Sequence, residues 1–237
     1  MAWYYLIPDM NLHYVYIFFQ LIAFLFAISI HESAHAWMAS RCGDPTARML
    51  GRITLNPLRH IDPVGTILLP AIALFTGFPM IGWAKPTPVD PRNFQNPVRD
   101  DILVSVAGPA SNFLVVLVTV VLLGLLALIS PSAHYVVHTL ARSSGGLALD
   151  MGWITPLSLM FYQLMFINIL LGIFNLIPVP PLDGSHVLRH FLSGTALRLY
   201  DQMGIIGLVV LLFFGGRFLG MLMFPVVRFF NEILARI

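Results

Sequence analysis

The chain is poor in charge and has almost no cysteine. Asp, Glu, Lys and Arg make up 10% of its 237 residues, whereas about a quarter of a soluble domain is charged. Together with 58% hydrophobic residues, this excludes an ordinary soluble protein and indicates a polytopic membrane protein. The formal net charge of +2 gives no reason to expect nucleic-acid binding. The single cysteine, Cys42, excludes an intramolecular disulfide and a cysteine-based zinc site.

No cleavable signal peptide is expected, because the first apolar stretch lacks a basic segment before it. The connections between the apolar stretches are short. We therefore expect residues 1–237 to form a single integral-membrane domain without a soluble accessory domain.

Glutamate is also scarce, and one of the two glutamates stands in a motif. Glu32 lies between His31 and His35 in the sequence H-E-x-x-H, within an apolar stretch from Tyr14 to Ala39. Residues i and i+4 share a helix face, so both histidines can bind one Zn²⁺ while Glu32 lies near the metal-bound water. Ionisable groups at this depth cost roughly 2.5 to 3.5 kcal/mol each, and metal binding gives a reason for them. The motif predicts zinc-dependent hydrolysis inside a membrane.

A third zinc ligand is needed, because hydrolytic zinc sites usually have three protein ligands and one position for water. The best remaining acid is Asp183, which follows the apolar stretch Ile154–Ile177. The H-E-x-x-H motif also lies near the C-terminal end of its own stretch. His31, His35 and Asp183 therefore share one depth only if the two helices run in the same direction, which requires an odd number of crossings between them.

Apolar runs of about 20 residues predict the membrane spans. The segment Val64–Ile81 is barely long enough and is interrupted by glycine and proline, so we expect it to be re-entrant. The stretch Pro131–Asp150 is too polar to cross. Four spanning helices remain: Tyr14–Ala39, Ile102–Ile129, Ile154–Ile177 and Gly204–Phe224.

The positive-inside rule orients this arrangement, because most basic residues fall on the side where the motif helix ends. We therefore expect a multi-pass protein of the cell membrane with its N-terminus outside and its active site toward the cytoplasmic half. The basic residues on the predicted cytoplasmic side are Arg41, Arg48, Arg52, Arg59, Lys85, Arg92, Arg99, Arg189 and Arg198.

These motifs together resemble those of the site-2 protease family of intramembrane zinc metalloproteases (peptidase family M50). His31–His35 resembles the zinc motif of the family, and Asn175–Gly184 resembles its second motif, N-x-x-P-x-x-P-L-D-G. Gly108–Asn112 resembles the small-residue motif of the middle core helix. Two further segments, Gly51–Pro57 and Trp83–Val89, resemble sequences found in the compact bacterial subgroup of this family, which lacks PDZ and CBS domains.

The resemblance implies an all-α fold in which three transmembrane helices hold one Zn²⁺, with extra helices and a membrane-associated re-entrant or β-hairpin segment. It implies regulated intramembrane proteolysis, the hydrolysis of peptide bonds within or near transmembrane segments of membrane proteins. Single-pass proteins such as anti-sigma factors or signal-peptide remnants would be the substrates. Glu32 is then the general base, and His31, His35 and Asp183 are the zinc ligands. Asn175 is expected to bind the oxyanion or the substrate, with a helix–helix hydrogen bond as the alternative.

A helical substrate must be unwound before attack, because its amides are already hydrogen-bonded. The segment Gly82–Asn96, rich in proline and β-formers, is predicted to present a β-edge that binds the unwound strand. An ordinary proline-rich loop is the alternative.

Several other polar residues have simpler interpretations. His134 and His138 are expected to form a pair in an external loop. His186 and His190 fit a polar loop at the cytoplasmic surface, with contact to the ligands or an alternative ligand role left open. Asn112 is expected either to reach the motif helix through a hydrogen bond or only to pack.

Two other functions are compatible with a zinc site in a membrane. A metal transporter would bind zinc transiently, but it has no need of a base such as Glu32 between two ligands. A catalytically silent membrane binding module would be expected to have lost one of His31, Glu32, His35 or Asp183, and all four are present.

Overall fold

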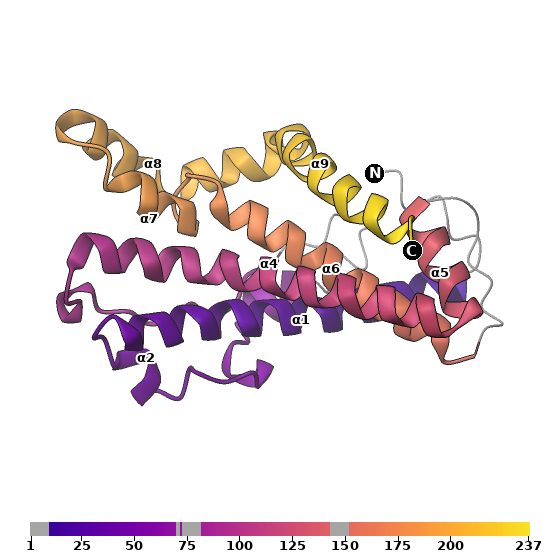
Figure 1. Ribbon diagram of the computed structural model, residues 1–237. Coiled ribbons are helices and arrows are strands. Elements are labelled where there is room, and N and C mark those ends of the chain that lie inside the picture. The colour runs from indigo at the N-terminus through magenta and orange to yellow at the C-terminus, as the bar shows by residue number, and fades with distance from the viewer. Residues whose placement is uncertain (1–9, 70–71, 73–81, 143–151) are drawn as a thin grey trace.

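The computed structural model describes residues 10–69, 72, 82–142 and 152–237, and these residues form helices and loops but no strand (Figure 1). Within these described residues, three helices are long and apolar enough to cross a bilayer: α1 (Met10–Arg41), α4 (Pro97–Ile129) and α6 (Ile154–Leu176). They coincide with three of the predicted spans. The chain is therefore an all-α polytopic membrane protein, as its composition predicted.

The three long helices lie side by side, and each packs against the other two. In Figure 1, α4 runs opposite to α1 and α6, so the C-terminal ends of α1 and α6 reach the same end of the bundle. This parallel direction of α1 and α6 is required if the two histidines and Asp183 are to lie at the same depth in the membrane. The short helices α2 (Thr46–Met49) and α7 (Asp183–Arg189) follow α1 and α6 at that end.

The predicted fourth span, Gly204–Phe224, is wrong as a single helix. The structure divides this run between α8 (Gly194–Phe214) and α9 (Gly216–Leu234). At Gly215, between the two helices, a Cβ atom would lie 2.2 Å from the carbonyl oxygen of Leu211. The backbone is also non-helical at Gly204, where φ is +39°. Hydropathy alone could not reveal either break, because glycine counts as neutral in an apolar run.

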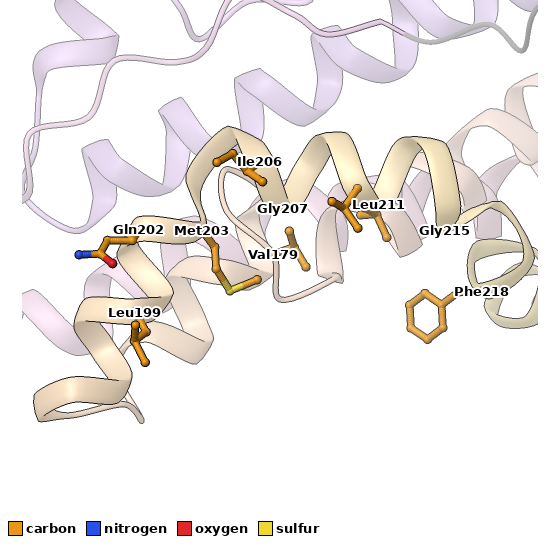
Figure 2. A pocket seen from close by; sticks show the side chains of 10 residues that line it. Val179, Leu199, Gln202, Met203, Ile206, Gly207, Leu211, Gly215 and Phe218 are labelled. Carbon is orange, nitrogen blue, oxygen red and sulfur yellow. The ribbon is translucent and has the colours of Figure 1, made fainter.

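An apolar groove of about 630 Å³ lies along α8, between this helix, the loop before α7 and the start of α9 (Figure 2). Gln202 is the one polar side chain among its lining residues. The groove therefore has no group that could perform hydrolysis. Its lining includes Val179, Leu199, Met203, Ile206, Leu211 and Phe218.

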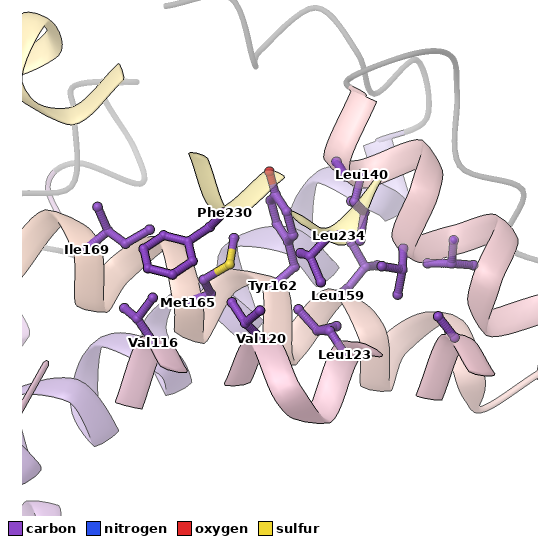
Figure 3. Close-up of a cluster of buried hydrophobic side chains, with 14 residues drawn as sticks. Val116, Val120, Leu123, Leu140, Leu159, Tyr162, Met165, Ile169, Phe230 and Leu234 are labelled. Carbon is purple, nitrogen blue, oxygen red and sulfur yellow. The ribbon is translucent and has the colours of Figure 1, made fainter. Parts of the chain in front are cut away.

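The largest buried apolar cluster joins α4, α5 (Pro131–Arg142), α6 and α9 (Figure 3). It lies at the end of the bundle where α1 begins, away from the H-E-x-x-H motif. Burying apolar side chains stabilises the fold by about 25 cal/mol per Å², so this cluster fixes α6 against α4. Its fully or almost fully buried members include Val116, Leu123, Tyr162, Met165, Ile169 and Leu234.

The helix α5 is too short to cross the membrane, as predicted for this stretch. Its 12 residues extend for about 18 Å at 1.5 Å per residue. His134 and His138 lie on it with their rings stacked, 5.6 Å between centroids. The predicted pair is therefore present, but it lies on a short helix and not in an irregular loop.

The connection between α1 and α4 is described only in part. Most of the predicted re-entrant segment, residues 64–81, lies outside the described residues. Its beginning is a π-helix, η3 (Pro63–Leu68), which starts where the Asp62 carboxylate accepts hydrogen bonds from the Val64 and Gly65 amides. Two 3-10 turns, η2 (Pro57–Arg59) and η4 (Pro91–Asn93), flank this part of the chain.

Residues 82–96 do not form the predicted β-edge in the described structure. They are irregular from residue 82 to residue 90, then enter η4, and no strand is formed. The described residues therefore agree with the alternative interpretation, a proline-rich connecting segment.

Candidate metal centre

His31 and His35 on α1 meet Asp183, the first residue of α7. The Nε2 atoms of His31 and His35 lie 3.2 Å and 3.4 Å from Asp183 Oδ2, and they are 3.0 Å from each other. Both histidines are buried, with 6% and 8% of their surface exposed. The three residues that the sequence predicted as ligands are thus brought together, and each offers one ligand atom.

Hydrogen bonds on the far side of each ring determine which nitrogen faces this cluster. The Nδ1 atom of His35 lies 2.7 Å from the carbonyl oxygen of Val104, which can only accept. Nδ1 of His35 therefore carries the proton, and its Nε2 presents a lone pair.

The same argument holds for His31 through a chain of two amides. Asn168 donates from Nδ2 to the carbonyl oxygen of Leu164 at 2.7 Å, so its Oδ1 faces Asn112. Asn112 donates from Nδ2 to that oxygen at 2.8 Å, so its own Oδ1 faces His31 Nδ1 at 2.7 Å. His31 therefore also carries its proton on Nδ1 and turns a lone pair of Nε2 toward the cluster.

Three acceptor atoms therefore converge: two imidazole lone pairs and one carboxylate oxygen. Asp183 Oδ2 is fully buried and has no hydrogen-bond donor among the described residues. A buried acceptor without a partner costs about 1 to 3 kcal/mol, and a cation removes this cost. Two histidines and one carboxylate are a donor set of catalytic zinc sites, in which the fourth position is left for water. The residues present therefore fit Zn²⁺.

The middle helix approaches this cluster closely at Gly108. A Cβ atom there would lie 2.4 Å from His35 Nε2 and 2.6 Å from His31 Cε1, in the space that a metal ion held by these residues would need. The sequence predicted close packing for this small-residue motif but missed its contact with the ligand atoms. At Gly184 a Cβ atom would lie 2.3 Å from the carbonyl oxygen of Leu176, so this position also has no room for a side chain.

Glu32 is half-buried beside the histidines and interacts with the segment between α1 and α4. Its Oε2 accepts hydrogen bonds from the Thr87 amide at 2.8 Å and from the Thr87 hydroxyl at 2.7 Å. Neither Thr87 nor Asn168 was identified from the sequence. Asn168 could have been suspected, because it is a polar residue seven positions before Asn175 in an apolar stretch.

Asn175 lies in the last turn of α6 and donates from Nδ2 to the carbonyl oxygen of Leu171 at 3.1 Å. This bond is within its own helix, one turn back. The loop that follows is held by Tyr200, whose hydroxyl donates to the carbonyl oxygen of Pro178 at 3.0 Å.

His186 and His190 are not in a polar loop but on α7 and at its end, where both contact Asp101 of α4. His190 Nε2 lies 2.7 Å from Asp101 Oδ2, and His186 Nδ1 lies 3.6 Å from Oδ1. Their partner is a carboxylate of a neighbouring helix, so they hold α7, whose first residue is Asp183, against α4. The nearby Asp101 carboxylate raises the pKa of His186 above its ordinary value.

Comparison with known proteins agrees with this geometry. The model of peptidase family M50 matches residues 19–214. YwhC of Bacillus subtilis (strain 168), provisionally named a zinc metalloprotease, is 35% identical over 195 residues, which are 82% of this chain and 78% of YwhC. Rip2 of Mycolicibacterium smegmatis (strain ATCC 700084 / mc(2)155), named in the same way, is 32% identical over 205 residues, 85% of this chain and 69% of Rip2. No solved structure matches the chain.

The matched range includes the whole metal centre and all three long helices except the first turns of α1. It therefore extends over His31, Glu32, His35 and Asp183. A match of this extent is not limited to the short H-E-x-x-H pattern. The chain belongs to peptidase family M50, the site-2 protease family that its motifs resemble.

Proposed function

We propose that this protein is an intramembrane zinc metalloprotease that hydrolyses peptide bonds within or near transmembrane segments of other membrane proteins. One observation supports this most directly: three acceptor atoms of His31, His35 and Asp183 converge next to Glu32, between helices long enough to span a bilayer. The histidines and the aspartate would hold one Zn²⁺. The reaction would be the cleavage step of regulated intramembrane proteolysis.

Zinc, when bound, lowers the pKa of a coordinated water from about 16 to about 7 and polarises a carbonyl group. Glu32 is the proton carrier among the residues of the site. It accepts a proton as the water oxygen bonds to the carbonyl carbon, and it returns a proton to the amide nitrogen as the C–N bond breaks. Such general acid–base steps typically contribute about 10² to 10⁴ in rate. The products are a carboxylic acid and an amine, which ionise to a carboxylate and an ammonium group.

Asn175 is the proposed donor to the oxyanion or to the substrate backbone. It lies at the end of α6, eight residues before Asp183. Its side-chain amide donates to the carbonyl oxygen of Leu171 at 3.1 Å. A rotamer change can release this donor toward a substrate, because the Leu171 carbonyl keeps its main-chain hydrogen bond within α6. A donor at this position would add to the stabilisation of the oxyanion.

The substrate has to be unwound, and the segment that contacts Glu32 is suited to hold it. Residues 83–90 are not helical and reach the motif helix at Thr87. An unwound substrate strand that lies along this irregular segment would bring its amide bond to Glu32. Transmembrane proteins in the same bilayer are the proposed partners.

The orientation follows from charge. Helix α1 ends at Arg41, Arg48 follows on α2 and Arg189 follows α6 on α7, and the candidate metal centre lies toward that end. By the positive-inside rule this end faces the cytoplasm. We therefore place the active site in the cytoplasmic half of the cell membrane.

The experiment is cleavage of a panel of tagged single-pass proteins in liposomes, with zinc content measured on the same samples. Glu32→Gln is the test variant. Glu232→Gln is the matched control, because Glu232 is the other glutamate of the chain and forms an exposed pair with Arg228 on α9. We expect the native protein and the Glu232→Gln variant to cut within the transmembrane segment, and Glu32→Gln to keep zinc without cutting.

Three other results would contradict the proposal. Retained cutting by Glu32→Gln excludes this residue as the base. Bound zinc without cutting of any substrate by the native protein supports a binding module instead, and zinc carried across the liposome membrane supports a transporter.

A further inference from the structure

Thr87 has contacts with Glu32 that a connecting loop does not require. Both its amide and its hydroxyl reach Glu32 Oε2, at 2.8 Å and 2.7 Å. The hydroxyl is also 3.0 Å from the main-chain oxygen of Glu32. Since a hydroxyl has one proton, it donates to one of these two oxygens at a time, and the carboxylate is the shorter contact. One oxygen of the carboxylate is thus held by two donors from one residue.

The local sequence presents Thr87 for this contact. It lies between Pro86 and Pro88, neither of which has an amide proton, so Thr87 carries the one main-chain donor of the three residues. The proline that follows favours an extended conformation at Thr87. The donor is therefore directed outward to a neighbouring group, and that group is the carboxylate of Glu32.

The segment around Thr87 is attached to the protein on its N-terminal side without help from Glu32. The Trp83 amide donates to the carbonyl oxygen of Gly65 at 3.3 Å, and the Thr66 hydroxyl donates to the carbonyl oxygen of Trp83 at 2.8 Å. The Lys85 amide donates to the carbonyl oxygen of His60 at 2.8 Å.

The C-terminal side is attached as well. The Asp90 amide donates to Asp44 Oδ2 at 2.8 Å, and the Asn93 side chain donates to Asp44 Oδ1 at 2.9 Å. Asp44 is fully buried, and its other bonds to Thr46 fix it after α1. Thr87 therefore projects from a segment fixed at both ends.

We infer that Thr87 is a positioning residue for Glu32, and that it sets which carboxylate oxygen takes part in proton transfer. This inference rests on the proposed role of Glu32 as the base. With Oε2 held by Thr87, Oε1 is the oxygen left to receive the proton from the attacking water. The two bonds also hold the side chain in one rotamer, so the oxygen does not have to be reoriented during the reaction. Thr87 acts through Glu32, and its hydrogen bonds among the described residues all go to Glu32.

Three variants separate this role from a general loosening of the segment. Thr87→Val removes the hydroxyl at nearly constant shape, and Thr87→Ser keeps the hydroxyl. Thr66→Val is the matched control, because it removes a threonine hydroxyl bond that fixes the same segment at Trp83 without contacting Glu32.

The first readout is steady-state cleavage with zinc content. We expect Thr87→Val to lower kcat about tenfold to a hundredfold, part of the effect of a general base, with KM and zinc content unchanged. Thr87→Ser should restore most of the native kcat, and Thr66→Val should leave it close to native. Native kcat in Thr87→Val, or an equal loss in Thr66→Val, overturns the inference.

The second readout does not depend on proteolysis. The chain contains only two glutamates, Glu32 and Glu232, so labelling glutamate carboxyls with carbon-13 gives two resonances, and Glu232→Gln assigns them. Thr87→Val should shift the Glu32 resonance, and Thr66→Val should not. A Glu32 resonance unchanged by Thr87→Val overturns the contact itself. If the resonance shifts but the native protein cleaves nothing, the contact stands and the proposed protease function fails.

Discussion

Asn112 on the middle helix accepts a hydrogen bond from His31 Nδ1 at 2.7 Å, and so it determines that Nε2 of this ligand faces Asp183. Asn112 is itself oriented by Asn168 of α6 at 2.8 Å. Residues from all three core helices thus act together to point the Nε2 lone pair of His31 toward Asp183. The packing of α1, α4 and α6 and the ability to bind zinc are therefore linked through buried amides.

This link predicts the effect of Asn112→Leu, which keeps the approximate shape but removes the acceptor. His31 can then rotate or change tautomer, and partners of this kind typically contribute about 10- to 100-fold in metal affinity. We expect that loss of affinity, measured as zinc retained against a series of chelator concentrations. Asn231→Leu is the control, because Asn231 bonds to Tyr162 within the apolar cluster at the other end of the bundle. Equal zinc affinity in Asn112→Leu and the native protein would show that Asn112 only packs.

The convergence of His31, His35 and Asp183 was predictable from sequence. The spacing of His31 and His35 is a property of one helix, and Asp183 could be assigned by asking which acid shares their depth. The Asn112–Asn168 pair could not be predicted, since it depends on the rotation of two helices about their axes. Thr87 was missed for a similar reason: it lies 55 residues from Glu32, in a segment without periodicity. The division of the predicted fourth span depends on backbone geometry at Gly215 that hydropathy does not contain.

Gly108→Ala should abolish zinc binding. The added methyl would lie 2.4 Å from His35 Nε2, where neither the ring nor a metal can be accommodated without movement. Gly124→Ala on the same helix is the matched control, because its methyl meets only the flexible end of Ile237, at 2.9 Å. We expect zinc content near zero for Gly108→Ala and near native for Gly124→Ala, with both proteins folded by circular dichroism. A Gly108→Ala protein that still holds zinc would contradict the position of the metal.

The contact between Asp101 and α7 should depend on pH. The nearby Asp101 carboxylate raises the pKa of His186 above 6.5, Asp183 acts in the same direction, and Arg189 opposes it. A raised pKa in the folded state means that the stabilisation is fully present below about 6.5 and is lost as the pH rises through the folded value. Asp101→Asn should therefore speed hydrogen exchange of the α7 amides at low pH more than at high pH.

The size of this effect should be modest, about 0.2 to 1 kcal/mol, because His186 is half-exposed and exposed pairs are screened. The measurement compares native and Asp101→Asn protein at each pH, which cancels the intrinsic pH dependence of exchange. Arg198→Gln is the control, since it removes an exposed contact with Thr195 on α8 and leaves the Asp101 contacts and the groups that act on His186 in place. An Asp101→Asn effect that is the same at all pH values would show that the contact does not depend on the charge of His186.

Zinc removal should lower the thermal stability of the native protein. Without a cation, two imidazole lone pairs and the Asp183 carboxylate face one another at 3.0 to 3.4 Å, and with zinc the folded state alone has the complete site. A ligand that binds only the folded state stabilises it by about 2.7 kcal/mol at a hundred times its Kd. We expect Tm in detergent to fall with a chelator and to recover with added zinc. In Asp183→Asn, which replaces the charged ligand by a neutral amide, added zinc should raise Tm much less. An equal rise in both proteins would place the zinc that stabilises the fold somewhere other than at His31, His35 and Asp183.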